Sequence, residues 1–195
     1  MGRTATVERN TNETKISITL DLDGSGKSQI YTGIGFFDHM LTLFAKHACI
    51  DLNVKTEGDL YVDGHHSVED TGIVLGEAIK KALGDKACIT RYGNFLLPMD
   101  ETLVLCAVDL CGRPYLGFEL EFKAPLIGGL DTQLVREFFY AVSYTLGASI
   151  HLRQMSGVND HHISEAAFKG FGRALRQAIS YDPRERGIPS TKGVI

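Results

Sequence analysis

The sequence has no concentration of positive charge, no long apolar segment and no paired cysteine motif. Its 195 residues carry a formal net charge of -4, and without a lysine and arginine cluster a nucleic-acid-binding protein is not indicated. No apolar run is long enough to span a bilayer, and the N-terminus lacks the apolar core of a signal peptide. The four cysteines show no CxxC spacing. We therefore expect reduced thiols in a cytoplasmic protein.

Two nucleotide- and phosphate-binding loops are also missing. The segment Gly33-Ile34-Gly35-Phe36-Phe37-Asp38 has an aspartate where a dinucleotide-binding loop has its third glycine, and the sequence contains no Walker loop. A phosphate would therefore be held by side chains, for which the arginine fork is suited. For any single basic residue a solvated surface role is the simpler interpretation. Those at turns or beside the motifs described next are Arg91, Arg113, Lys169, Arg173, Arg176 and Lys192.

Two short motifs dominate what the sequence does contain. Each is a double histidine followed by a glutamate, at His65-His66-Ser67-Val68-Glu69 and at His161-His162-Ile163-Ser164-Glu165. On a helix, the glutamate shares a face with both histidines, being four residues from the first and three from the second. Adjacent histidines point about 100° apart on a helix, which indicates two divalent ions with one histidine for each. Polar residues are common at the starts of helices, so one such motif could arise by chance. Two copies argue against a chance occurrence.

The predicted elements occur twice in the same order. In the first half we expect a strand over 3–22, a hairpin partner over 28–32, a helix over 36–47, strands within 49–62 and a helix over 65–84. In the second half we expect strands over 103–108 and 115–122, a helix over 132–147, a strand over 148–153 and a final helix. The two motifs lie 96 positions apart. This pattern predicts an α+β fold, a tandem duplication of a half with a small, mostly antiparallel sheet and two helices on one side. The expected parts are 1–88, 89–181 and a C-terminal tail at 182–195, together one compact unit.

A side chain that can bind metal also lies upstream of each motif. His39 precedes His65 by 26 residues, and Glu137 precedes His161 by 24 residues. Imidazole and carboxylate donors suit Mn, Fe, Zn or Ni, and both hydrolysis by metal-activated water and Lewis-acid activation of a substrate remain open. The candidate metal ligands are His39, His65, His66, Glu69, Glu137, His161, His162 and Glu165.

Three segments closely resemble the imidazoleglycerol-phosphate dehydratase family of histidine biosynthesis. They are Asp38-His39-Met40-Leu41, the stretch from Asp63 to Gly72 and the stretch from Asn159 to Lys169, and the likeness extends over essentially the whole chain. The resemblance implies a hydro-lyase that converts imidazoleglycerol phosphate to imidazole acetol phosphate. It also implies a tandem ribosomal-protein-domain-like fold and self-assembly into a homo-24-mer with active sites between subunits.

The same resemblance implies how the site works. Two Mn ions per active site would stabilise an imidazolate of the substrate, with Glu13 as the acid/base group. One ion would be held by His65, Glu137, His161 and Glu165, and the other by His39, His66, Glu69 and His162. The residues that match the phosphate-binding positions are Arg91, Arg113, Lys169, Ser190 and Lys192.

Two positions depart from the family pattern. Many members carry histidine where this chain has Glu137, and many carry a phosphate-contacting glutamine where it has Leu43. Carboxylate can replace imidazole on manganese, whereas a leucine cannot bind phosphate. Two other functions remain to be weighed, a dinuclear metallohydrolase that acts on a phosphate ester and a non-catalytic shell protein held together by metal.

Overall fold

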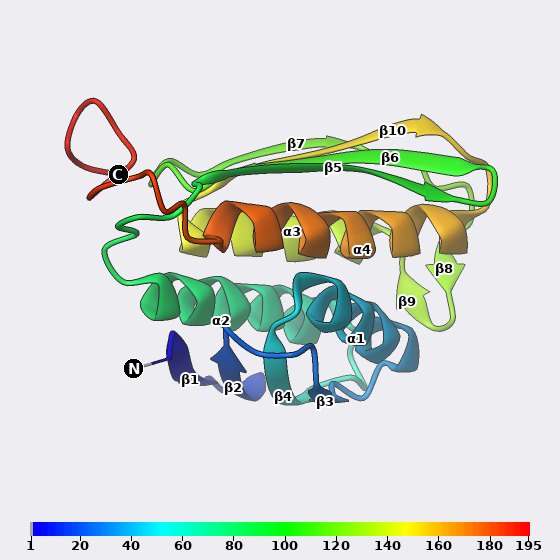
Figure 1. Cartoon of the computed structure of the whole chain (residues 1–195). Helices are drawn as coiled ribbons and strands as arrows, with labels where there is room; N and C mark the ends of the chain where they lie inside the picture. The colour runs from blue at the N-terminus through cyan, green and yellow to red at the C-terminus, as the bar shows by residue number, and fades with distance from the viewer. Residues whose placement is uncertain (1) are drawn as a thin grey trace.

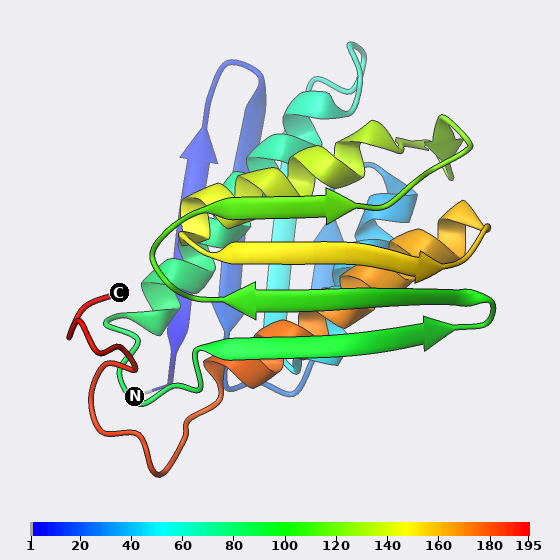
Figure 2. The same cartoon turned by 90° about the horizontal axis from the view of Figure 1, so that it is seen from above.

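The chain forms four layers in the order sheet, helices, helices, sheet (Figure 1). The computed structural model describes residues 2–195; Met1, part of the N-terminal segment considered above, lies outside the described residues. Each outer layer is a mixed sheet of four strands, and the two sheets have their strands running across one another (Figure 2). The inner layers are formed by four helices, two from each half of the chain. The helices of each half therefore lie on one side of their sheet, as predicted.

The N-terminal half builds the sheet drawn in blue and cyan in Figure 1. Its second strand alternates buried and exposed side chains, with Ile16, Ile18 and Leu20 facing the helices. The strand order is β1-β2-β4-β3, in which β3 runs parallel to β4 and the other pairs are antiparallel. The elements are β1 (Thr4–Asn10), β2 (Thr14–Asp21), β3 (Ser28–Tyr31), α1 (Gly35–Ala48), β4 (Asp51–Gly58) and α2 (His65–Leu83).

The C-terminal half repeats this arrangement. Its strand order is β5-β6-β10-β7, with β7 parallel to β10. A two-stranded hairpin, β8 (Leu126–Ile127) and β9 (Leu130–Asp131), is inserted before its first helix. The matched topology confirms the α+β fold with a duplicated half. The remaining elements are β5 (Tyr92–Met99), β6 (Thr102–Asp109), β7 (Tyr115–Glu119), α3 (Gln133–Leu146), β10 (Ser149–Ser156) and α4 (Asp160–Ile179).

The halves meet helix to helix, and the contact is itself duplicated. Helix α1 packs on α4, and α2 packs on α3. A Cβ added at Gly76 of α2 would lie 2.9 Å from the carbonyl oxygen of Val142. A Cβ added at Gly172 of α4 would lie 2.8 Å from the carbonyl oxygen of Phe44. A glycine at the same place in each half thus lets the helix backbones approach closely, around a fully buried group of phenylalanines: Phe37, Phe44, Phe138, Phe139, Phe168 and Phe171.

The helices predicted over 36–47, 65–84 and 132–147 are confirmed as α1, α2 and α3, whereas several strand predictions are wrong. The expected single strand over 3–22 is the antiparallel pair β1 and β2, and the polar stretch that interrupts it is their turn, where Thr11 N–H donates to the carbonyl of Thr14. The segment 28–32 does not form a hairpin with that strand, because β3 pairs with β4 in parallel. Residues 59–64 form a turn rather than a further strand.

The second half shows the same pairing error and one omission. The turn at Cys111 to Pro114 does not close a hairpin, because β7 pairs with β10. Strand β5 was not predicted, and it contains Gly93 and Pro98, two residue types that are unfavourable inside a strand. Gly93 is required there because a Cβ would clash with the backbone of Ala174 in α4. Strand β5 is an edge strand, where proline is tolerated.

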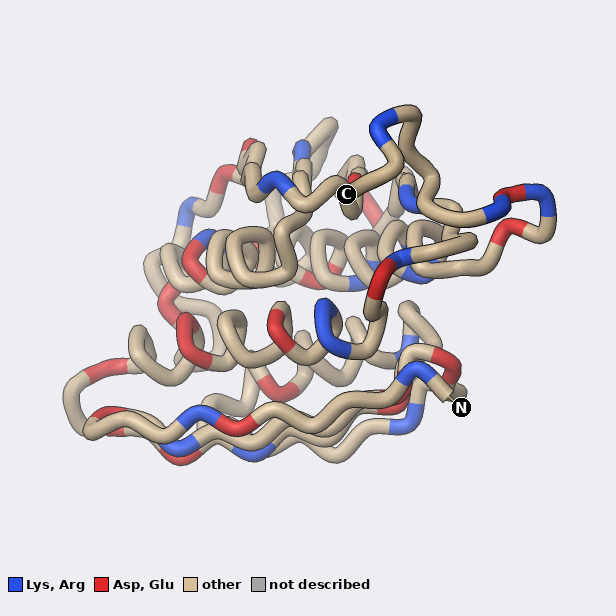
Figure 3. Tube along the Cα trace, turned by 90° about the vertical axis from the view of Figure 1, so that its left-hand side faces the viewer, with Lys and Arg blue, Asp and Glu red and all other residues tan. Residues whose placement is uncertain are grey.

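The first sheet carries no patch of a single sign of charge. Basic and acidic positions are interspersed along its strands (Figure 3). Within residues 2–195, no helix combines the length and apolarity that crossing a bilayer demands.

Candidate metal centre

Helices α1 and α4 bring three metal-binding side chains together at their N-terminal ends. The Nε2 atom of His39 lies 3.0 Å from Glu165 Oε1, and the Nε2 atom of His161 lies 2.9 Å from the same oxygen. The three ligand atoms lie within 4.8 Å of one another. Since α1 belongs to the first half and α4 to the second, this centre is built at the interface between the halves.

The carboxylate of Glu165 is ionised and held by cationic and imidazole neighbours. Its side chain is only 8% exposed. Burial by itself raises the pKa of Glu165, but hydrogen bonds from Lys169, His39 and His161 outweigh that effect and bring the pKa to about 2. The ammonium group of Lys169 is ion-paired with the second oxygen of this carboxylate. A divalent cation at the centre would take over the charge compensation that Lys169 supplies here.

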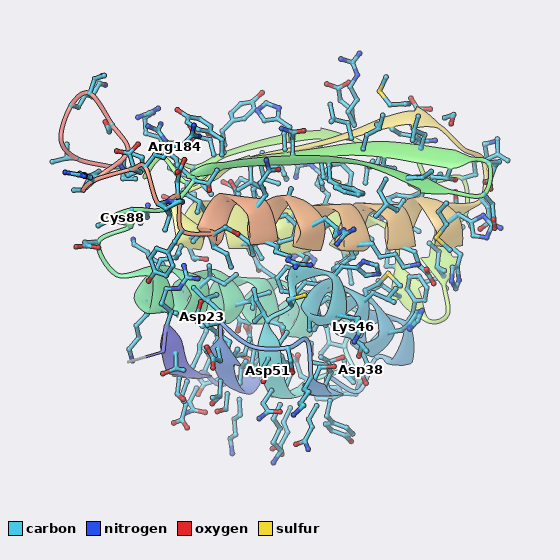
Figure 4. All side chains as sticks on the ribbon, in the orientation of Figure 1. Asp23, Asp38, Lys46, Asp51, Cys88 and Arg184 are labelled. Atoms are coloured by element: carbon cyan, nitrogen blue, oxygen red, sulfur yellow. The ribbon has the colours of Figure 1, made fainter. Side chains whose placement is uncertain are left out.

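The ends of both helices are fixed by local hydrogen bonds that aim these side chains. Asp38 accepts hydrogen bonds from the backbone and hydroxyl of Thr32, which holds the β3–α1 connection on the side of the first sheet (Figure 4). Asn159 caps α4, because its side-chain oxygen accepts from the backbone N–H groups of His161 and His162. His39 and His161 therefore both lie within the first turns of helices whose starting points are set.

The equivalent residues at the α2–α3 crossing are His65 and Glu69 on α2 and Glu137 on α3. His65 and Glu137 line one cavity of about 700 Å³ together with residues of the β8–β9 hairpin. His65 Nε2 lies 3.8 Å from Glu69 Oε2. Glu137, however, is ion-paired with Arg136 at 2.9 Å. Where the α1–α4 crossing has His39, this crossing has the carboxylate of Glu137, and within residues 2–195 only His39, His161 and Glu165 bring three possible ligand atoms within 4.8 Å of one another.

The second histidine of each motif is held by a carboxylate from outside the motif. His66 Nδ1 lies 3.1 Å from Asp59 Oδ2, and His162 Nδ1 lies 2.8 Å from Glu101 Oε2. These hydrogen bonds raise the pKa of both imidazoles. The Nε2 atom of His66 lies 3.8 Å from Glu13 Oε1. The predicted acid/base group thus lies beside a predicted metal ligand.

Four of the five predicted phosphate-binding residues share one cavity at the C-terminal tail. The cavity has a volume of about 600 Å³ and is lined by Arg91, Arg113, Ser190 and Lys192. Arg91 is already engaged, since it donates to both carboxylate oxygens of Asp109 and to the carbonyl of Pro189. Lys169 does not line this cavity in the chain, because it lies at the α1–α4 centre.

Sequence reasoning missed the carboxylates that hold the second histidines. Glu101 directly precedes β6, as Glu13 directly precedes β2, so an alignment of the halves by these strands would have indicated it. Asp59 has no such counterpart, and its role depends on the turn that follows β4. Leu43, at the usual glutamine position, is partly buried against the core rather than presented to a ligand.

Comparison with known proteins gives matches over the full chain. The sequence profile described as imidazoleglycerol-phosphate dehydratase matches residues 32–175. Imidazoleglycerol-phosphate dehydratases from Lachnoclostridium phytofermentans and Acetivibrio thermocellus are 58% and 56% identical over 195 residues, with complete coverage of both chains.

Solved structures lead to the same family. The imidazoleglycerol-phosphate dehydratase of Staphylococcus aureus is similar with a TM-score of 0.83 and 40% identity, covering 92% of this chain and 99% of its own. The Pyrococcus furiosus enzyme in complex with (S)-C348 gives a TM-score of 0.84 and 41% identity, covering 97% and 100%. The fold and the centre thus define a duplicated α+β enzyme with a histidine–glutamate site between its halves. The chain belongs to the imidazoleglycerol-phosphate dehydratase family and is a hydro-lyase of histidine biosynthesis.

Proposed function

We propose that the protein removes water from imidazoleglycerol phosphate to give imidazole acetol phosphate, with two divalent metal ions per active site. The observation that carries the proposal is the convergence of His39, His161 and Glu165 at the α1–α4 crossing, with their ligand atoms within 4.8 Å of one another. Neutral imidazole and ionised carboxylate form a donor set that suits manganese, and no thiol is present in the group to favour a soft metal. The site chemistry therefore fits the ions that the family resemblance implies.

The chain holds its candidate ligands in separate groups, which supports active sites completed by neighbouring copies. The resemblance assigns His39 to one ion, and His161 with Glu165 to the other, whereas the structure brings these three together. His65 lies at the other helix crossing. We infer that each ion takes ligands from more than one subunit. Large apolar side chains support this assembly, because they are exposed in the segments that directly precede the motifs: Leu60, Tyr61, Val62, Met155 and Val158.

We further infer that these contacts build the homo-24-mer implied by the family resemblance. A closed symmetric shell repeats the same contacts in every copy, so each subunit can give ligands to its neighbours and receive ligands from them.

Glu13 is the residue that we assign to proton transfer. Bound divalent ions would supply Lewis acidity that stabilises negative charge on the substrate imidazole ring. The hydroxyl leaves from the carbon attached to the ring, and Glu13 takes the proton from the next carbon, giving an enol that becomes the ketone. The Glu13 side chain is 55% exposed and lies 3.8 Å from His66 Nε2. It is thus accessible to substrate and adjacent to a metal ligand.

The phosphate group of the substrate is assigned to the basic residues of the tail cavity, with Lys169 supplied from the metal centre. Arg113, Ser190 and Lys192 offer donors there, and Asp109 keeps the guanidinium of Arg91 oriented. The hydrogen bond to Asp109 also raises the pKa of Arg91, so its charge persists. Because Leu43 cannot contact phosphate, these basic residues carry the binding.

The direct test is to incubate the metal-loaded protein with imidazoleglycerol phosphate and to follow the ketone product by NMR and inorganic phosphate by a colorimetric assay. The proposal predicts imidazole acetol phosphate with its phosphate ester intact. Release of inorganic phosphate without ketone would instead identify a phosphoester hydrolase. A fully assembled, metal-loaded protein that yields neither product would contradict any catalytic assignment.

A further inference from the structure

The second histidines of the two motifs share a feature that the ligand assignment does not explain. Each has its Nδ1 atom bound to a carboxylate outside the motif, Asp59 for His66 and Glu101 for His162. A carboxylate accepts a hydrogen bond, so in the neutral imidazole Nδ1 carries the proton and Nε2 keeps the lone pair. That lone pair is the one a metal ion needs. A hydrogen-bonded partner at the other ring nitrogen is the usual means of fixing the tautomer and orientation of a metal-binding histidine.

Glu101 is held in place more firmly than its contact with one histidine would require. Its Oε1 atom accepts from the backbone N–H groups of Val158 at 3.2 Å and Asn159 at 2.9 Å. Its Oε2 atom is then left for His162 Nδ1 at 2.8 Å. The Thr102 hydroxyl also donates to Oε1, at 3.1 Å. The carboxylate therefore bridges the β5–β6 turn, the loop before α4 and the imidazole.

The duplicated fold shows that the two equivalent glutamates have diverged. Glu13 and Glu101 each directly precede the second strand of their half, β2 and β6. Glu13 is 55% exposed and approaches the Nε2 atom of its histidine, whereas Glu101 approaches the Nδ1 atom. One copy of this position is thus left free for substrate, while the other is tied to the backbone and to a ligand histidine.

We propose that Glu101 is a positioning residue that holds His162 in the tautomer with a metal-binding Nε2 lone pair, and that Asp59 does the same for His66. This inference rests on the proposed function, because it requires His162 and His66 to bind the metal ions. Neither carboxylate is a catalytic residue. Their contribution is to fix which nitrogen faces the ion and in which direction.

The test uses the difference between carboxylate and amide at position 101. In Glu101→Gln the amide oxygen remains with the two backbone N–H groups, so the amide nitrogen faces His162 Nδ1. A donor then meets a donor, and His162 is driven to the tautomer that carries its proton on Nε2. Manganese affinity, measured by calorimetric titration into metal-free protein, should fall about 10- to 100-fold at one class of sites. A role of Glu101 only in holding the loop predicts unchanged affinity, because Gln retains those backbone contacts.

Asp59 provides an independent variant with a different expectation. It has no backbone N–H partner for its carboxylate among the described hydrogen bonds, so an asparagine there can rotate and present its oxygen to His66. Asp59→Asn should therefore leave manganese affinity close to that of the parent protein, while Asp59→Ala should weaken it. The matched control is Glu8→Gln, an exposed strand residue that makes the same carboxylate-to-amide change.

His162→Ala, measured in parallel, separates the assignment of His162 as a metal ligand from the positioning role of Glu101. If that variant weakens manganese binding and Glu101→Gln does not, the positioning role is overturned and the metal assignment stands. If His162→Ala leaves binding unchanged, the metal assignment itself fails and the positioning role fails with it. Should Glu101→Gln not fold, the Asp59→Asn and Asp59→Ala pair decides, and equal affinity in the two variants would overturn the proposal.

Discussion

At the scale of single residues, the site is a set of histidines in which the Nε2 and Nδ1 atoms have different partners. His39 and His161 point Nε2 at the same oxygen of Glu165, and His162 gives Nδ1 to Glu101. The ligand types could be predicted from sequence, because the histidine–glutamate spacing on a helix is regular. Of the carboxylates behind the second histidines, Glu101 follows only from an alignment of the two halves by their strands, and Asp59 could not be predicted because its role depends on the turn after β4.

Glu13→Gln tests the acid/base assignment. The amide keeps the size of the side chain but cannot take a proton, so kcat should fall by a factor of about 100 or more, the range typical of general base catalysis. Manganese binding and assembly should be retained, because the Glu13 side chain is exposed and no ligand set includes it. Steady-state kinetics checks this, with Glu8→Gln as the control. Dehydration at the parent rate by the Gln variant would remove Glu13 from the mechanism.

At the scale of helices and strands, the helices were predictable and the order of the strands was not. Helical periodicity with a buried stripe is a local signal, and α1, α2 and α3 agree with it. The parallel pairs β3–β4 and β7–β10 join strands that a helix separates in sequence, so no local pattern reports them. Sequence therefore placed His39 on a helix but could not show that α1 packs on α4.

The glycines at the helix crossings provide a test of this packing. In Gly76→Ala the new methyl group would lie 2.9 Å from the carbonyl oxygen of Val142 and 3.1 Å from the nitrogen of Leu146. The helices must separate, which should cost about 1–3 kcal/mol and exceed the gain in helix propensity of about 1 kcal/mol. Thermal or urea unfolding measures the loss. Gly35→Ala is the control, because a Cβ there meets nothing within 4 Å. Equal stability of both variants would contradict the close approach of α2 and α3.

At the scale of the whole molecule, two equivalent halves bury one another's helices and share a candidate metal centre. We propose that 1–88 and 89–181, with the tail 182–195, form one folding unit, since α1 and α2 each pack on a helix of the other half. An additional contact joins the N-terminal segment to the end of α4. Arg3 donates to the carbonyl of Ile179, stacks on the ring of Tyr181 at 4.4 Å and pairs with Asp23, which lies near the N-terminal strands (Figure 4).

The pairing of Arg3 with Asp23 predicts a small pH dependence of stability. The hydrogen bond from Arg3 lowers the pKa of Asp23 below 3.8, so the pair stabilises the fold above pH 3.8 and loses this effect as the pH falls through the lowered pKa. Asp23 is 42% exposed, so solvent screening limits the contribution to less than about 1 kcal/mol. Unfolding of Asp23→Asn should show a small deficit at pH 7 that disappears near pH 2. A deficit that persists at low pH would assign the effect to something other than the ion pair.

Removal of the metal should change the assembly of the protein. Because the proposed ligands of each ion come from more than one copy, a chelator should convert the proposed homo-24-mer into smaller species, and added manganese should restore it. Size-exclusion chromatography with light scattering measures the mass. Magnesium, which prefers oxygen ligands, is the matched control and should restore it poorly. An assembly whose mass is independent of metal would show that the ions lie within single subunits.

The central claim is that the duplicated histidine–glutamate motifs bind two ions through both halves of the chain. Anomalous diffraction from crystals of the manganese-loaded protein tests it most directly. We predict two anomalous peaks per active site, with Glu165 and His161 at one of them and His162 ligating through Nε2 at the other. A single peak, or peaks away from the two motifs, would contradict the account.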